Sequence, residues 1–177
     1  MKVKYLNPFV EAAYEVLSQE IGANIQRGEL ALENGYYITD DVTVIIALVG
    51  AVEGNVFYSM SQTTAIQLAS RMMSEKLHAL DSLAQSGIAE LSNVITGRAS
   101  MKLSDAGFEA TISPPSLLIG KGASISTLDF PRVIVPLQTS EGDLIIHLAL
   151  RQGMRNDLKT SQIAIPSSPL PEISGNR

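Results

Sequence analysis

Apolar and polar residues follow a helical period over residues 80–107. At about 100° per residue, one narrow face of this helix collects apolar side chains: Ala84, Ile88, Leu91 and Ile95. The opposite side carries a stripe about 16 Å long, at a rise of about 1.5 Å per residue, which we call the polar stripe: Ser86, Glu90, Asn93 and Gly97. A lone amphipathic helix does not hold together in water, so we expect its apolar face to dock on a sheet. The polar stripe then faces outward, within reach of a partner.

Two further helices are predicted before this one. The first covers residues 8–21, with Asn7 as its cap and Pro8 at its first position. The second covers residues 62–73 and is capped by Ser61. The apolar residues expected to face inward from the second helix are Ile66, Ala69, Met72 and Met73.

Period-two runs and turn residues predict six strands: residues 23–35, 36–50, 51–61, 108–122, 130–140 and 143–151. Asn34-Gly35 is a hairpin signal between the first two strands, and a second hairpin turn is expected at residues 141–143. Residues 42–49 are apolar on both faces, as in the middle of a covered sheet. Adjacent Pro114 and Pro115 indicate a bend or a sheet edge, because proline cannot donate to a ladder.

The order of these elements is α, βββ, αα, βββ, which predicts an α+β fold. We expect a mostly antiparallel six-stranded sheet built of two three-strand meanders, with about three helices packed on one face and one of them long and central. This domain is expected to span residues 1–152. From residue 153 to 177 the composition shifts to Pro, Ser, Gly and Asn, which predicts a flexible tail.

Charge and composition narrow the classes of partner. The formal net charge is −5 and no cluster of Lys and Arg occurs, which argues against nucleic acid and anionic membranes. Cysteine is absent, so neither a disulfide framework nor a thiolate metal site is possible. The N-terminal sequence lacks the pattern of a signal peptide, and the most apolar stretch, residues 42–52, is too short to span a bilayer. We therefore predict a cytoplasmic protein.

Conventional catalytic sets are absent from the sequence, whereas the polar stripe is unusual. His78 and His147 are the only histidines, and neither has a partner at ligand spacing, so a conventional hydrolase or oxidoreductase is not indicated. Ser, Glu and Asn on the outside of a helix are usually a solvated face. Asn93, however, is a poor residue for a helix interior, and Gly97 costs about 1 kcal/mol against Ala there. Their position on the exposed side counts against a purely solvated face, and it makes the stripe a candidate binding surface that these residues alone do not identify.

The motif Glu90-x-x-Asn93 resembles the central signature of the CheC/CheX/FliY chemotaxis phosphatases. The surrounding residues fit the same signature, and they include Ser86, Gly97, Ala99, Leu103 and Gly107. Further features resemble the CheX branch, and they are Asn7-Pro8-Phe9, the turn from Val49-Gly50 to Gly54-Asn55-Val56, and Ser113-Pro114-Pro115. The first helix has Glu11 and Tyr14 where a second Glu/Asn signature would need to be, so one site per chain is expected, as in that branch.

The resemblance implies an enzyme that removes phosphate from the aspartate of a phosphorylated CheY-like response regulator. The resemblance also implies that Glu90 pairs with the regulator's active-site lysine, and that Asn93 inserts beside the phosphate and orients the attacking water. Ser86 and Gly97 belong to the partner-binding surface. No cofactor of its own is expected, while Mg²⁺ is expected on the regulator. The resemblance also implies a homodimer, for which the edge strands and the Pro114-Pro115 segment are candidate interfaces.

Two other classes of function remain open from the sequence. One is a non-catalytic adaptor that binds a receiver domain of a chemotaxis or other two-component pathway without dephosphorylating it. The other is a small-molecule-binding α+β domain that shares only the architecture, and it would need a roomy apolar pocket for which no motif is present.

Overall fold

The computed structural model describes residues 3–127 and 130–153, and within them it contains three helices and ten strands. The helices are α1 (Val3–Gln19), α2 (Gln62–Met73) and α3 (Ser82–Asp105). The first five strands are β1 (Ile25–Arg27), β2 (Ala31–Glu33), β3 (Tyr36–Ile38), β4 (Val42–Gly50) and β5 (Val52–Met60). The last five are β6 (Ala110–Ile112), β7 (Ser116–Ile119), β8 (Ser124–Ser126), β9 (Arg132–Thr139) and β10 (Gly142–Gln152).

Eight of these strands form one antiparallel sheet in the order β1-β9-β10-β5-β4-β6, in which β2 also pairs with β9 and β7 also pairs with β4. The α+β prediction is confirmed, and the sheet has eight strands instead of six because two predicted strands each break into two strands of this sheet. The predicted strand 36–50 also breaks, into β3 and β4, but β3 lies outside this sheet. Residues 108–122 break at Pro114-Pro115 into β6 and β7, both of which pair with β4 at the edge. Residues 23–35 break near Gly28, whose amide donates to the Pro136 carbonyl at 2.9 Å, and give β1 and β2 on β9.

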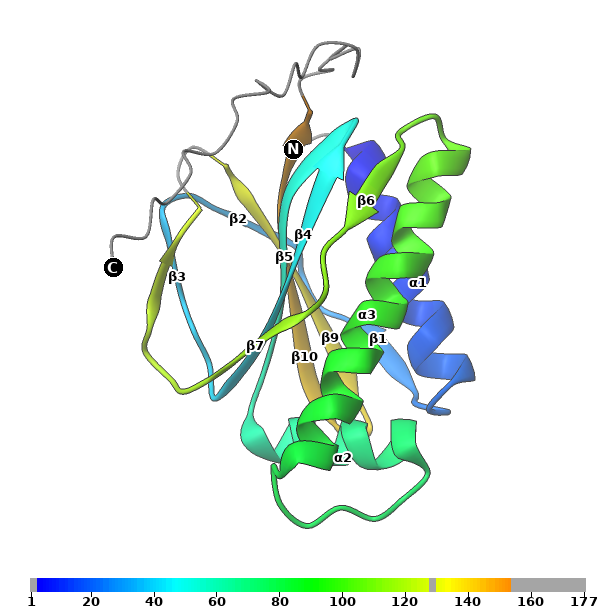
Figure 1. The fold of residues 1–177 in the computed structure, drawn as a ribbon, viewed down its shortest axis with the longest axis vertical. Helices are drawn as coiled ribbons and strands as arrows, with labels where there is room; N and C mark the ends of the chain where they lie inside the picture. Colours follow the sequence, from blue (N-terminus) through cyan, green and yellow to red (C-terminus); the bar gives the residue numbers. More distant parts are fainter. Residues whose placement is uncertain (1–2, 128–129, 154–177) are drawn as a thin grey trace, which may run out of the picture.

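The hairpin predicted at Asn34-Gly35 is wrong. Gly35 does adopt a positive φ of 88°, so the chain turns there, but β2 and β3 do not pair with each other. The β2 strand pairs with β9 in the main sheet, whereas β3 pairs with β8 in a separate two-stranded sheet. The β3–β8 pair covers the face of the main sheet opposite the helices, where Tyr37, Phe57 and Ala149 form a small second core (Figure 1).

The three helices pack on one face of the main sheet, as predicted (Figure 1). The α1 helix begins at Val3, five residues before the predicted start, and Pro8 lies inside it. Proline removes one helical hydrogen bond. Burial outweighs that loss, because Tyr5 and Phe9 are at most 1% exposed and the Tyr5 ring packs edge-on against Phe108 at 5.4 Å between centroids.

The α2 helix has the predicted bounds and the predicted cap, since the Ser61 hydroxyl accepts from the Thr64 amide at 3.1 Å. Its inward face agrees with the prediction only in part: Ala69 is buried and Met72 is partly buried against the core, whereas Ile66 is half-buried and Met73 is exposed. The buried residues are Thr64, Ala65, Leu68 and Ala69. Ala69 on this face lies close to Gly87 of α3, and Met73, at the end of the helix, is 39% exposed.

The β9–β10 hairpin turns at residues 140–141, just before the predicted turn, because Gly142 already belongs to β10. The predicted central strand, residues 42–49, lies in β4, which has β5 on one side and β6 and β7 on the other. The predicted tail lies outside the described residues except for Gly153, whose amide donates to the Ala51 carbonyl at 3.0 Å.

Candidate functional site

The polar stripe lies on α3, which forms where residues 80–107 predicted one long helix. Its start is fixed by Asp81, whose carboxylate accepts from the amides of Leu83 and Ala84 at 3.1 and 3.0 Å. An aspartate in this position satisfies amides that otherwise lack a partner and interacts favourably with the helix dipole. The cap therefore sets the start, and hence the register, of a helix of 24 residues.

The inward side of α3 is held by apolar packing and by one buried chain of hydrogen bonds. All four apolar residues predicted for this face, Ala84, Ile88, Leu91 and Ile95, are at most 1% exposed. The Thr96 hydroxyl donates to the Ser92 carbonyl at 2.8 Å, so the 2.7 Å contact between Tyr58 and Thr96 has the Tyr58 hydroxyl as its donor. Burial raises the pKa of Tyr58, which keeps that donor protonated. Ser92 and Thr96 flank Asn93 in sequence, so this chain fixes the helix to β5 directly behind the stripe.

The outward side of α3 presents the stripe as predicted from the helical period. Ser86 and Glu90 are exposed, while Asn93 and Gly97 are half-buried. Among the described residues, the Glu90 carboxylate and the Asn93 amide make no hydrogen bond or ion pair. The Ser86 hydroxyl donates to the Ser82 carbonyl at 2.8 Å, so it faces a partner only as an acceptor. Glu90 and Asn93 are thus a free carboxylate and a free amide three residues apart on one face.

The cations of α3 are used within the fold. Lys102 lies 2.7 Å from Glu15 and 3.4 Å from Glu11 on α1, and the hydrogen bond to Glu15 raises the pKa of Lys102. Arg98 pairs in the same way with Glu20 at 3.2 Å. These pairs tie α3 to α1 and to the residue that follows it, and neither cation is paired with Glu90. They also occupy Glu11, the α1 residue at the position of a second signature.

Two glycines of α3 serve different surfaces. A Cβ on Gly87 would lie 3.1 Å from Met73 Cγ and 3.2 Å from Ala69 Cβ, so Gly87 is the point of close approach to α2. A Cβ on Gly97 would meet only Ile112 Cδ1, at 3.9 Å, which is ordinary contact. The packing is therefore tight at position 87 and open at position 97. Sequence reasoning singled out Gly97, whereas the packing requirement at Gly87 became visible only once α2 and α3 were placed.

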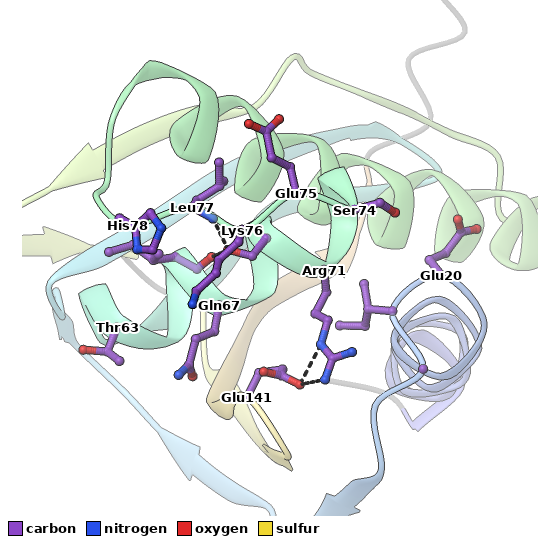
Figure 2. Close-up of a pocket in the computed structure, with 14 residues that line it drawn as sticks. Glu20, Thr63, Gln67, Arg71, Ser74, Glu75, Lys76, Leu77, His78 and Glu141 are labelled. Atoms are coloured by element: carbon purple, nitrogen blue, oxygen red, sulfur yellow. Dashed lines mark hydrogen bonds and ion pairs between the residues drawn. The ribbon is translucent and has the colours of Figure 1, made fainter.

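A groove of about 900 Å³ lies at a different place, between the end of α1, α2 and the loop that follows α2, and the β9–β10 turn (Figure 2). Arg71 reaches across to Glu141 at 2.9 Å, and Lys76 and His78 also line the groove (Figure 2). None of the polar stripe's residues lines it. The rim of mixed charges is unlike the roomy apolar pocket that a small-molecule-binding domain would need.

Two features are absent from the described part of the chain. No cluster of three or more His, Cys, Asp or Glu residues that could hold a metal ion occurs there. No helix there is both long and apolar enough to cross a membrane. Asp40 and Asp41, adjacent carboxylates, instead make contacts within the fold, with Lys121 at 3.6 Å and with the Gln62 amide at 3.1 Å.

Comparison with known proteins agrees with this architecture. The sequence profile of the family described as chemotaxis phosphatase CheX matches residues 42–138, which is more than half of the chain and includes α3. A relative from Thermotoga maritima, named CheY-P phosphatase CheX, is 29% identical over 154 residues, which are 86% of this chain and 99% of the relative.

Solved structures give the same result. A CheC-like superfamily protein from Shewanella sp. PV-4 superposes with a TM-score of 0.76 and 26% identity, over 85% of this chain and 99% of that one. A chain of the CheX–CheY–BeF3–Mg²⁺ complex from Borrelia burgdorferi gives a TM-score of 0.72 and 30% identity, over 85% of this chain and all of that one (100%). The structural and sequence comparisons thus agree, and the matched region includes the helix that carries the free carboxylate and amide. The chain belongs to the CheX family of chemotaxis phosphatases.

Proposed function

We propose that this protein is a phosphatase that removes phosphate from the aspartate of a phosphorylated CheY-like receiver domain. The observation that carries the proposal is the pair of unpartnered groups, the Glu90 carboxylate and the Asn93 amide, on the outward face of a firmly packed helix. The name of the Thermotoga maritima relative supports the activity, and the Borrelia burgdorferi complex with CheY supports the partner.

In this proposal Asn93 orients the attacking water. An acyl phosphate is already an activated group, so its hydrolysis needs positioning and charge stabilisation more than a strong base. The Asn side chain offers both a donor and an acceptor, and it can therefore hold a water molecule in line with the phosphorus. Because the amide is neutral, it adds no negative charge beside the phosphoryl oxygens.

Glu90 is the anchor of the complex. Its uncompensated charge and exposed position suit a contact with the active-site lysine of the receiver, and an ion pair at an interface fixes register and improves specificity. Glu90 and Asn93 share a face at i and i+3, so the lysine contact sets where the amide sits. Ser86, one turn earlier, accepts a hydrogen bond from the partner, and Gly97 lets the partner approach the helix backbone.

The metal ion of this reaction belongs to the partner. Mg²⁺ on the receiver offsets the phosphoryl charge, and the Borrelia burgdorferi complex contains Mg²⁺ together with CheY. The protein itself contributes the amide and the carboxylate.

We further propose that it acts in the cytoplasm and as a homodimer, with edge strands and the Pro114-Pro115 segment as the candidate interface. Light scattering of the purified protein tests the dimer, and the mass of one chain would contradict it.

The lifetime of the phosphate on a phosphorylated CheY-like receiver tests the activity. We expect the wild-type protein to shorten this lifetime and the Glu90→Ala/Asn93→Ala double variant to leave it at the value of the receiver alone. Asn7→Ala is the matched control, because Asn7 is an exposed asparagine on α1, outside the stripe, and this variant should act like the wild type. A receiver that binds the wild type with an unchanged phosphate lifetime would contradict the phosphatase and establish the adaptor.

A further inference from the structure

The outward face of α3 continues beyond Gly97 to an exposed apolar side chain. Met101 is 62% exposed, and among the described residues it is the one large apolar side chain of α3 that is exposed. It lies one turn after Gly97 and eleven residues after Glu90. At about 100° per residue, Met101 is therefore rotated by only about 20° from Glu90 around the helix. At a rise of about 1.5 Å per residue, the two positions are about 16 Å apart along the axis.

The neighbours of Met101 on α3 do not cover it. Arg98 and Lys102 turn toward α1, where each pairs with a glutamate. Ala99 and Leu103 are buried beneath the helix. A single exposed apolar residue on a surface needs no explanation of its own. Its alignment with the unpartnered Glu90, on the side of the helix that also carries Asn93, is what sets Met101 apart from other exposed apolar residues.

We propose that Met101 is a second anchor for the same receiver domain, an apolar contact about 16 Å from the Glu90 contact along α3. This inference rests on the proposed function and adds the chemistry that the receiver must present. The receiver carries an apolar side chain at that distance from the lysine that pairs with Glu90. An ion pair fixes one point of the helix on the partner, and the apolar contact at the other end fixes its direction.

Methionine suits this role because its unbranched side chain adapts to the shape of the surface that it meets. The anchor acts on binding and has no part in the chemistry, since it lies far from the water that Asn93 holds. Met101 is therefore a specificity residue, and changing it alters the affinity for the receiver while the rate within the complex stays the same.

The affinity for the receiver is measured with a receiver that carries Mg²⁺ and beryllium fluoride, as in the Borrelia burgdorferi complex. This form of the receiver undergoes no hydrolysis during the titration. Met101→Ser is expected to raise Kd about tenfold, which corresponds to about 1.4 kcal/mol. Met101→Leu should keep the wild-type Kd. Leu32→Ser is the control, because Leu32 is also 62% exposed but lies on β2, and it should leave Kd unchanged.

The phosphate-release rate at saturating protein is measured in parallel. We expect Met101→Ser to match the wild type in this rate. An unchanged Kd for Met101→Ser would overturn the anchor and leave the phosphatase standing. A lower rate at saturation with an unchanged Kd would overturn it as well, because Met101 would then act on the chemistry. If the wild type binds no receiver, both the proposed function and the proposed role of Met101 are contradicted.

Discussion

The role proposed for Asn93 would account for a residue that the stability of α3 does not favour. Asparagine is a poor residue for the middle of a helix, and here its amide makes no hydrogen bond within the described chain that would repay this cost. A neutral group with one donor and one acceptor side is what water positioning requires. Glu90 supplies the one charge of the pair, and the two cations of α3, Arg98 and Lys102, form their ion pairs with Glu20 and Glu15 instead.

Asn93→Asp tests the need for a neutral amide at that position. Aspartate has the same shape, but its carboxylate offers no donor and brings a negative charge toward the phosphoryl group. We expect the phosphate-release rate to fall about 100-fold, the scale of a lost positioning group, and the Kd for the phosphorylated receiver to rise. Retention of the wild-type rate in a stopped-flow measurement would contradict the role of the amide as a donor.

The sequence could predict the stripe because helical spacing alone places Ser86, Glu90, Asn93 and Gly97 on one face. The roles proposed for Glu90 and Asn93 rest on the family resemblance, since spacing does not distinguish a docking face from a solvated one. The bond from Ser86 back to Ser82 and the use of Lys102 by α1 could not be predicted. Both depend on rotamers and on which helix lies beside α3.

At the scale of elements, α3 is held in place by its N-terminal cap, by packing against α1 and α2, and by a hydrogen bond from β5. The α1 and α2 helices pack against it (Figure 1). Asp81 caps its start, and the Tyr58 hydroxyl on β5 forms a hydrogen bond with its Thr96. A group that must be placed to within a fraction of an ångström benefits from a rigid support. The packing of α3 therefore contributes to the positioning of Asn93 as well as to the stability of the fold.

Tyr58→Phe tests the buried link between β5 and α3. The change removes one hydrogen bond and leaves Thr96 still donating to Ser92, so we expect the free energy of unfolding to fall by about 1 kcal/mol. Urea unfolding measures this loss. Tyr36→Phe is the control, because Tyr36 is 68% exposed on β3 and should be neutral. A Tyr58→Phe protein as stable as the wild type would show that the link contributes nothing.

Gly97→Ala separates stability from binding on the same helix. The nearest atom to a Cβ at this position is 3.9 Å away, so alanine fits and should raise the free energy of unfolding by up to about 1 kcal/mol. The added methyl group should weaken receiver binding, because it stands where the partner approaches. Gly87→Ala, which would press on Ala69 and Met73, should lack this gain in stability. A more stable Gly97→Ala protein with unchanged affinity would remove Gly97 from the interface.

The elements that the sequence predicted well are those with local signals. The Ser61 cap and the helical period define α2 and α3 without reference to other segments. The Asn34-Gly35 hairpin failed because β9 and β8, about 90–100 residues further along the chain, compete successfully for β2 and β3. The early start of α1 was missed because burial of Tyr5 outweighs the local effect of Pro8.

At the scale of the whole molecule, the sheet separates two environments. The helices and the proposed docking face lie on one side, and the small core under β3 and β8 lies on the other (Figure 1). His147 faces that second core, with its ring 4.6 Å from the Tyr37 ring. Burial, together with the nearby Arg132 charge, lowers the pKa of His147 from 6.5 to about 4.

This shift predicts a loss of stability in mild acid. The unfolded chain binds a proton at His147 below pH 6.5, whereas the folded chain does so only below about pH 4. Stability from this group is therefore complete above pH 6.5 and is lost as the pH falls toward 4, by about 3 kcal/mol in total and about 2 kcal/mol by pH 5. Urea unfolding at pH 7.5 and pH 5 measures the difference.

His147→Gln should remove that part of the pH dependence, and His78→Gln, at an exposed histidine in the loop before α3, should keep it. If His147→Gln and the wild type lose the same stability between pH 7.5 and pH 5, the histidine is not the group responsible.

The most direct test of the central claim is single-turnover release of phosphate from a phosphorylated CheY-like receiver, measured against the concentration of the protein. Glu90→Ala should shift the curve to higher concentration, because it loses the anchor. Asn93→Ala should keep the half-saturating concentration and lower the maximal rate about 100-fold, because the water is no longer held. An Asn93→Ala protein that reaches the wild-type maximal rate would contradict the account.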